Sequence, residues 1–170
     1  MKTLIKAAVA ATVATGLFAS PAFAAPNTDN ADFTAKAKIV KAVTLVKDSD
    51  LDFGTITMLN TLTSQTVTVG QDNSKDCGGG DLTCSFPTQA SAGFTVTGVP
   101  TQALTVSLVA PTVLKTVSGD TVAFRPDAPS SVTVASTGSV IFGIGGEIDV
   151  VSATKDGSYN GDLTVTVTYQ

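Results

Sequence analysis

Apolar and polar residues alternate with a period of two through most of the chain beyond residue 24. Such alternation, carried by valine, threonine, isoleucine and phenylalanine, is typical of strands that bury one face. The clearest runs are residues 66–69, 94–97, 104–108, 132–134 and 163–169. Clusters of glycine, proline, aspartate, asparagine and serine separate them and indicate turns. Because no stretch there sustains a helical period, the pattern predicts an all-β domain of the β-sandwich class.

The first alternating run of the domain covers residues 33–39. Its apolar face carries Phe33, Ala35, Ala37 and Ile39, and its polar face carries Thr34, Lys36 and Lys38. The pattern continues through Val43 and Leu45, which is longer than a usual strand of about 5 to 6 residues. Two strands in series are therefore an alternative to one. Residues 25–32, which precede the run, are polar and predict a flexible N-terminal extension.

The first 24 residues have the three regions of a secretory signal peptide. Lys2 and Lys6 form the charged start, residues 7–18 the apolar stretch, and Ala22 and Ala24 the small residues before the cleavage site. The alternative is a membrane anchor, but the apolar stretch is shorter than the roughly 20 residues that a spanning helix needs. We therefore expect an exported chain, cleaved after Ala24, with one domain over residues 33–170 and no membrane-spanning segment.

The charge of the chain excludes two classes of partner. The net charge is −4, and the predicted signal peptide removes two lysines and no acid, so the mature chain is more acidic still. With Arg125 as the single arginine, the sequence predicts no basic surface for nucleic acid. An acidic chain is not attracted to anionic lipid either.

The two cysteines are expected to form a disulfide. Cys77 and Cys84 would meet an oxidising compartment after export. Three glycines, residues 78–80, lie between them and allow the tight turn that brings the two sulfurs together. A redox-active site is the alternative, but the spacing does not match a Cys-x-x-Cys motif.

The composition argues against catalysis. The chain has no histidine, which removes Ser-His-Asp and Cys-His machinery and most zinc sites. Glu147 is the single glutamate, and the aspartates lie mainly in turn-like contexts, so no acid–base pair is suggested. We expect a protein that is not an enzyme and has no cofactor.

Two short motifs could be mistaken for ligand sites. Residues 48–54 resemble the first half of a calcium loop, but the glycine falls one residue late and position 12 is Leu59. A polar turn leading into a strand is the simpler interpretation. Residues 143–146 are rich in glycine, as phosphate-binding loops are, but a strand-like alternation follows them where a helix is needed. We expect a bulge or a tight bend there.

The C-terminal segment carries the most specific pattern. Leu163, Val165 and Val167 alternate along it, Tyr169 is next to last, and Gly157 is fourteenth from the end. The chain thus ends inside its best predicted strand, whose free edge must be covered. This arrangement resembles the last strand of subunits of chaperone–usher pili.

Other segments resemble a bacterial secreted family, domain of unknown function 4402, which is related to those pilins. The matching segments are residues 51–54, 92–98, 142–146 and the Gly-x-Tyr-x-Gly stretch at 157–161.

The resemblance implies an incomplete, immunoglobulin-like β-sandwich that lacks its seventh strand. In such subunits a periplasmic chaperone fills the open groove first, and the N-terminal extension of the next subunit then replaces it by β-strand addition. The resemblance thus implies a donor strand and an assembly strand. The donor candidates are Phe33, Ala35, Ala37 and Ile39, and the C-terminal assembly strand is marked by Gly157, Leu163, Val165, Val167 and Tyr169.

The function expected from this resemblance is that of a structural subunit of a pilus-like assembly at the bacterial cell surface. Its partners would be copies of itself or related subunits, a periplasmic chaperone and an outer-membrane usher. Two features depart from the usual pilin: the cysteines close a local loop, and only nine residues run from Ala25 to Phe33. The alternative is a self-contained secreted β-sandwich that binds a carbohydrate or surface ligand, with residues 33–39 as its own first strand.

Overall fold

The computed structural model describes residues 29–39, 41–59 and 64–170. The chain divides into two units, residues 1–37 and residues 38–170. The predicted signal peptide lies outside the described residues, as do the first four residues of the predicted extension. All the strands of the described residues belong to the second unit, and the prediction of an all-β fold is confirmed.

The described part of the chain forms twelve strands and no helix. They are β1 (Thr44–Ser49), β2 (Thr55–Met58), β3 (Gln65–Val69), β4 (Lys75–Asp76), β5 (Leu82–Ser85), β6 (Ala92–Thr97), β7 (Ala103–Val109), β8 (Val113–Lys115), β9 (Thr121–Asp127), β10 (Ser131–Thr133), β11 (Ser139–Val150) and β12 (Thr164–Tyr169). Accordingly, the described residues contain no helix long and apolar enough to cross a bilayer.

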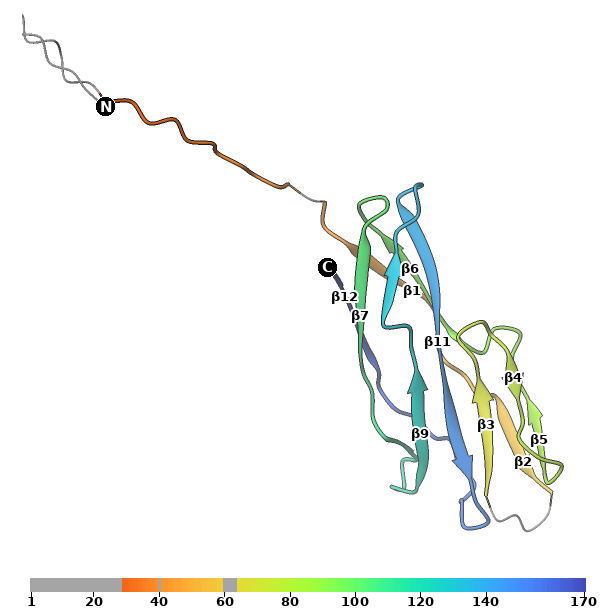
Figure 1. Ribbon diagram of the computed structural model, residues 1–170. Helices are drawn as coiled ribbons and strands as arrows, with labels where there is room; N and C mark the ends of the chain where they lie inside the picture. Colours follow the sequence, from red (N-terminus) through yellow and green to blue (C-terminus); the bar gives the residue numbers. More distant parts are fainter. Residues whose placement is uncertain (1–28, 40, 60–63) are drawn as a thin grey trace, which may run out of the picture. The chain divides into compact units, whose positions relative to one another are not determined.

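The strands make a sandwich-like arrangement of two layers (Figure 1). One layer is a sheet in the order β1-β6-β11-β3-β4. β9 also pairs with β11 in this sheet, and β8 pairs with β9. Residues 146–149 of β11 pair with β3 and with β9, so these two strands lie on opposite edges of β11. The other layer consists of two shorter sheets, β10-β7-β12 and β2-β5. All strand pairings among the described residues are antiparallel.

The larger sheet packs on each of the shorter sheets through a separate apolar cluster. The first cluster joins β3, β8, β9 and the C-terminal half of β11 to β5 and Phe53; the rings of Phe53 and Phe124 meet edge to face with centroids 6.2 Å apart. The second joins β6 and the N-terminal half of β11 to β7 and β12, and contains the stacked cross-strand pair Phe94 and Phe142, 5.5 Å apart. β11 therefore contributes to both clusters.

The glycines of β11 have a different role from the predicted one. The expectation of a bulge or bend at residues 143–146 is wrong, because β11 pairs continuously through them. A Cβ on Gly143 would meet the Gln71 carbonyl oxygen at 1.9 Å, and a Cβ on Gly145 would meet that of Val69 at 2.1 Å. On the other face, a Cβ on Gly146 would come within 2.8 Å of the Phe124 ring. The glycines allow chain segments to lie directly against β11.

The alternating segment 33–39 forms no strand in the described residues, where the first strand begins at Thr44. The alternative in which it is the first strand of its own domain is therefore not what the structure shows. Its two large apolar side chains, Phe33 and Ile39, are 92% and 94% exposed. A lone strand has no stable form in water without partners for its backbone groups and its apolar face.

Candidate functional site

A groove opens in the second layer between β2 and β12, the outermost strands of its two short sheets. Its volume is about 1240 Å³. The floor is the inner face of the larger sheet, with Phe94, Phe124, Ile144 and Ile148 among its residues, all buried. The groove thus lies where the second layer lacks a strand.

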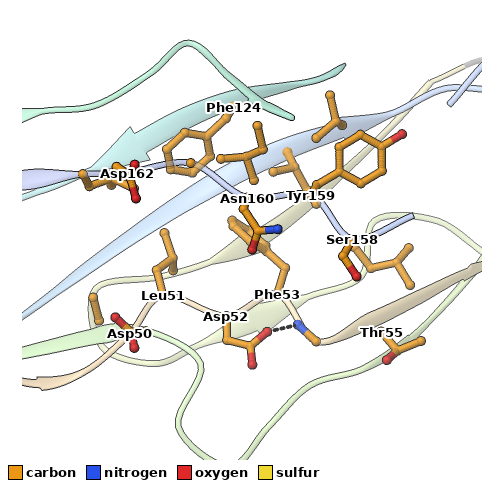
Figure 2. A pocket seen from close by; sticks show the side chains of 18 of the residues that line it. Asp50, Leu51, Asp52, Phe53, Thr55, Phe124, Ser158, Tyr159, Asn160 and Asp162 are labelled. Carbon is orange, nitrogen blue, oxygen red and sulfur yellow. Dashed lines mark hydrogen bonds between the residues drawn. The ribbon is translucent and has the colours of Figure 1, made fainter. Parts of the chain in front are cut away.

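Apolar side chains along both rims cover this floor only in part. Figure 2 shows Leu51 and Phe53 on one side of the groove and Tyr159 on the other, with Phe124 behind them. The apolar lining residues that remain half-buried or exposed are Leu51, Ile56, Met58, Leu108, Tyr159, Leu163 and Val165. These side chains have surface left to bury against an occupant of the groove.

Both rims present strand edges without a partner among the described residues. β2 pairs with β5 alone, and β12 pairs with β7 alone. Edges of this kind expose rows of N–H and C=O groups that can pair with another strand. A strand placed between them would unite the two short sheets in the order β5-β2-added strand-β12-β7-β10.

Local hydrogen bonds hold the rim that leads into β2. The Asp52 N–H donates to the Ala90 carbonyl oxygen at 2.8 Å, and the Gly54 N–H donates to Asp52 Oδ1 at 2.7 Å. Gly54 has a φ of +70°, and a Cβ there would meet the Ser85 carbonyl oxygen at 2.0 Å. This tight turn explains the glycine and places Leu51 and Phe53 toward the groove (Figure 2).

The opposite rim is tied to β8 and to its own loop. Lys115 and Asn160 exchange two backbone hydrogen bonds of 2.9 Å each. The Tyr159 hydroxyl donates to the Lys155 carbonyl oxygen at 2.7 Å. Gly157 lines the groove with a φ of +154°, a conformation that residues with a Cβ rarely adopt.

Tyr169 anchors the far end of β12. Its hydroxyl oxygen accepts a hydrogen bond from the Val99 N–H at 2.9 Å, and Gly98 leaves the room that this contact needs. Val167, two residues earlier, is buried in the second cluster. These contacts fix the register of β12, so that Val165 and Leu163 line the groove.

The predicted disulfide is confirmed and supports the β2 rim. Cys77 and Cys84 are bonded, with a Cα–Cα distance of 5.7 Å. Cys84 lies opposite Ile56 in the β2–β5 pair, and both cysteines pack against the first cluster. Because β5 is the strand that pairs with β2, the bridge helps to hold the rim strand in place.

Replacing Cys77 and Cys84 together with alanine is expected to lower the free energy of unfolding by about 2.5 kcal/mol, because the unfolded chain gains the entropy of an open loop. Urea denaturation of the oxidised protein and of the double variant measures this difference. Wild-type protein kept under reducing conditions should match the variant. Equal stability of the oxidised and open forms would show that the bridge is dispensable.

A cluster of polar side chains lies away from the groove, on the outer face of the larger sheet. Arg125 donates to both carboxylate oxygens of Asp149, with one bond of 2.8 Å, and to Glu147 Oε2 at 3.1 Å. Hydrogen bonds from Arg125 and then from Thr66 lower the pKa of Asp149 to about 2. These side chains satisfy one another's hydrogen-bonding groups on the surface of the sheet, and they thereby link β9, β11 and β3.

The acidic segment 48–54 comprises the last two residues of β1 and the connection from β1 to β2. Asp48 accepts a hydrogen bond from the Thr95 hydroxyl at 2.7 Å, and Asp50 pairs with Lys47. Asp52 holds the Gly54 N–H. The three carboxylates thus have separate partners, and the described residues contain no group of three or more potential metal ligands.

The predicted site residues fall into two sets. Leu163, Val165 and Gly157 line the groove, while Val167 and Tyr169 position its β12 rim. Phe33, Ala35, Ala37 and Ile39 lie in the exposed segment before β1. The β2 rim was missed by the sequence analysis, although Leu51, Phe53 and Ile56 are apolar residues close to the noted acidic turn.

Together, the two layers and the groove between unpaired strand edges define an all-β, sandwich-like domain with an open strand position. The family model described as "Domain of unknown function (DUF4402)" matches residues 43–169. The chain therefore belongs to that family, as the sequence resemblance predicted. No curated protein and no solved structure gave a significant match to the chain.

Proposed function

We propose that the protein is a non-catalytic structural subunit of a pilus-like surface assembly, and that it polymerises by taking an extended strand of another copy into the groove. The observation that carries this proposal is the groove itself, an apolar floor between two strand edges that lack partners in the described residues. Such a site suits β-strand addition, in which backbone pairing gives strength and alternate side chains give register.

Segment 33–39 is the occupant that the chain itself offers. Its alternation places Phe33, Ala35, Ala37 and Ile39 on one face, as a strand lying on the groove floor requires. Phe33 and Ile39 are almost fully exposed in the free segment. Burying each of them would contribute about 1.5 to 3 kcal/mol, in addition to the backbone hydrogen bonds.

The C-terminal pattern supports the same assignment. Gly157, the alternating Leu163, Val165 and Val167, and Tyr169 resemble the last strand of chaperone–usher pilins, and this segment forms the β12 side of the groove. We propose export through the signal peptide of residues 1–24, passage through the periplasm, and a final location at the cell surface. A periplasmic chaperone would occupy the groove before assembly, and an outer-membrane usher would direct the exchange.

The test is an unboiled SDS gel of the surface fraction of cells that express the full chain or a variant lacking residues 29–39. We expect a ladder of bands with the full chain, its collapse to a monomer on boiling, and a monomer band alone with the deletion. The deletion leaves all twelve described strands in place, so the variant should still unfold cooperatively on heating.

Point variants in the same segment make the test sharper. Phe33→Ser with Ile39→Ser should remove the ladder, whereas Asp29→Ser with Asp32→Ser, upstream of the apolar face, should keep it. A monomer band from the full chain, with cooperative unfolding of that monomer, would refute donor-strand polymerisation. The self-contained binding domain would then become the better assignment.

A further inference from the structure

The rims of the groove are acidic, although its floor is apolar. The charged residues that line it are Lys47, Asp50, Asp52, Lys155, Asp156 and Asp162. Four carboxylates and two ammonium groups give the rims a net charge of −2. Asp50 and Asp52 lie on the β2 side, and Asp162 lies across the groove from them (Figure 2). Negative charge thus borders the groove on both sides.

Much of the positive charge at the rims is already neutralised. Lys47 Nζ lies 2.6 Å from Asp50 Oδ1. The Asp52 carboxylate accepts a backbone hydrogen bond, which leaves its charge in place. Within the described residues, Asp156 and Asp162 make no hydrogen bond or ion pair, and Lys155 is the one remaining cation of the rims. An occupant of the groove therefore meets uncompensated carboxylates.

The polar face of segment 33–39 carries the opposite charge. Lys36 and Lys38 alternate with the apolar residues, and the segment contains no acid. In a strand seated with Phe33 and Ile39 toward the floor, both lysines point outward between the two rims. Neighbouring strands bring such side chains within reach of each other, where opposite charges attract and like charges repel.

We propose that the acidic rims, chiefly through Asp52, Asp156 and Asp162, select segment 33–39 of a second copy by contact with Lys36 and Lys38. This inference rests on the proposed function and adds a determinant of partner choice to it. The apolar face supplies most of the affinity, while the charges favour this segment over other apolar strands. The attraction between the lysines and the acidic rims also favours the encounter of two copies, because copies of a chain with net charge −4 otherwise repel each other.

The experiment measures binding of a fluorescent synthetic peptide of residues 29–39 to the monomeric full chain by anisotropy. In low salt, about 20 mM NaCl, a Lys36→Glu and Lys38→Glu peptide should bind roughly tenfold more weakly than the natural peptide. In about 500 mM NaCl, where screening is strong, the difference should fall to about twofold.

A matched pair of variants tests the rims. Asp156→Asn with Asp162→Asn removes two carboxylates that make no bond within the described residues, and should weaken binding about three- to fivefold in low salt. Asp120→Asn with Asp127→Asn, at the two ends of β9, removes two carboxylates that do not line the groove and should leave binding unchanged. All variants should have the melting temperature of the wild type.

The outcomes distinguish a failure of selection by charge from a failure of strand addition. If a Phe33→Ser and Ile39→Ser peptide loses binding while the lysine-to-glutamate peptide binds like the natural one, selection by charge is overturned and strand addition stands. If the natural peptide does not bind at all, both proposals fail. Equal losses for the Asp120→Asn and Asp127→Asn variant and for the rim variant would also overturn the charge inference, since the effect would then come from net charge alone.

Discussion

Replacing Gly145 with alanine is expected to lower the free energy of unfolding by about 3 to 5 kcal/mol. The added Cβ would lie 2.1 Å from the Val69 carbonyl oxygen and within 3 Å of the backbone at Gly70 and Gln71. The contacted atoms are main chain, so no side-chain rotation relieves the clash. Either β3 or β11 must shift, and both contribute to the first apolar cluster.

The matched control is Gly80→Ala. Gly80 has open space where a Cβ would lie, and its φ is not positive, so alanine there should change the stability by less than about 0.5 kcal/mol. Chemical denaturation of the two variants measures both effects. A Gly145→Ala protein as stable as Gly80→Ala would show that the chain following β3 does not lie against β11.

Val165→Asp is expected to abolish assembly and to lower the free energy of unfolding by about 2 to 4 kcal/mol. Val165 is half-buried in β12, lines the groove and packs against the second cluster. A carboxylate there is partly desolvated in the folded subunit and becomes more so when a strand covers the groove. Repulsion from the nearby acidic rim adds to this cost.

Thr166→Asp provides the control on the neighbouring residue. Thr166 is exposed, points to the opposite face of the sheet and pairs with Ser107. The same charge should change the stability there by no more than about 0.5 kcal/mol and leave the ladder on an unboiled gel intact. Assembly of Val165→Asp at the wild-type level would mean that the inward face of β12 does not receive the added strand.

The strands that the sequence analysis located are those whose alternation is long and uninterrupted. β3, β6, β7, β10 and β12 all correspond to such runs. β4 and β8, with two and three residues, are too short for periodicity to be visible. β9 extends through Pro126 to Asp127, where proline had indicated a turn. Proline is tolerated there because β8 pairs only with residues 121–123 of β9, so at Pro126 β11 is the single strand partner of β9 among the described residues.

β11 was only partly predicted, because its glycines break the apolar pattern. The alternation of residues 147–150 was noted, but the preceding glycines suggested an interruption. The continuous strand depends on chain segments far away in sequence, namely the end of β3 and the Phe124 ring, which occupy the space of the missing side chains. Contacts of this kind leave no local signal beyond the glycines themselves.

The candidate site could be predicted on one side only. β12 carries a strong local pattern, so Leu163 and Val165 were identified before the structure was known. The β2 rim has a weaker pattern, and the groove arises from the distance between two strands that belong to separate sheets. Segment 33–39 has a clear alternation in the sequence and yet forms no strand, because it has no neighbouring strand to pair with among the described residues.

The position of the groove between two short sheets has a mechanical consequence. An added strand would pair with β2 along one edge and with β12 along the other, with its axis parallel to both. Tension carried along that strand then acts at right angles to its hydrogen bonds and loads many of them at once. A joint loaded in shear resists far more force than one that is peeled apart bond by bond. The arrangement thus suits a link that must hold under a steady pull.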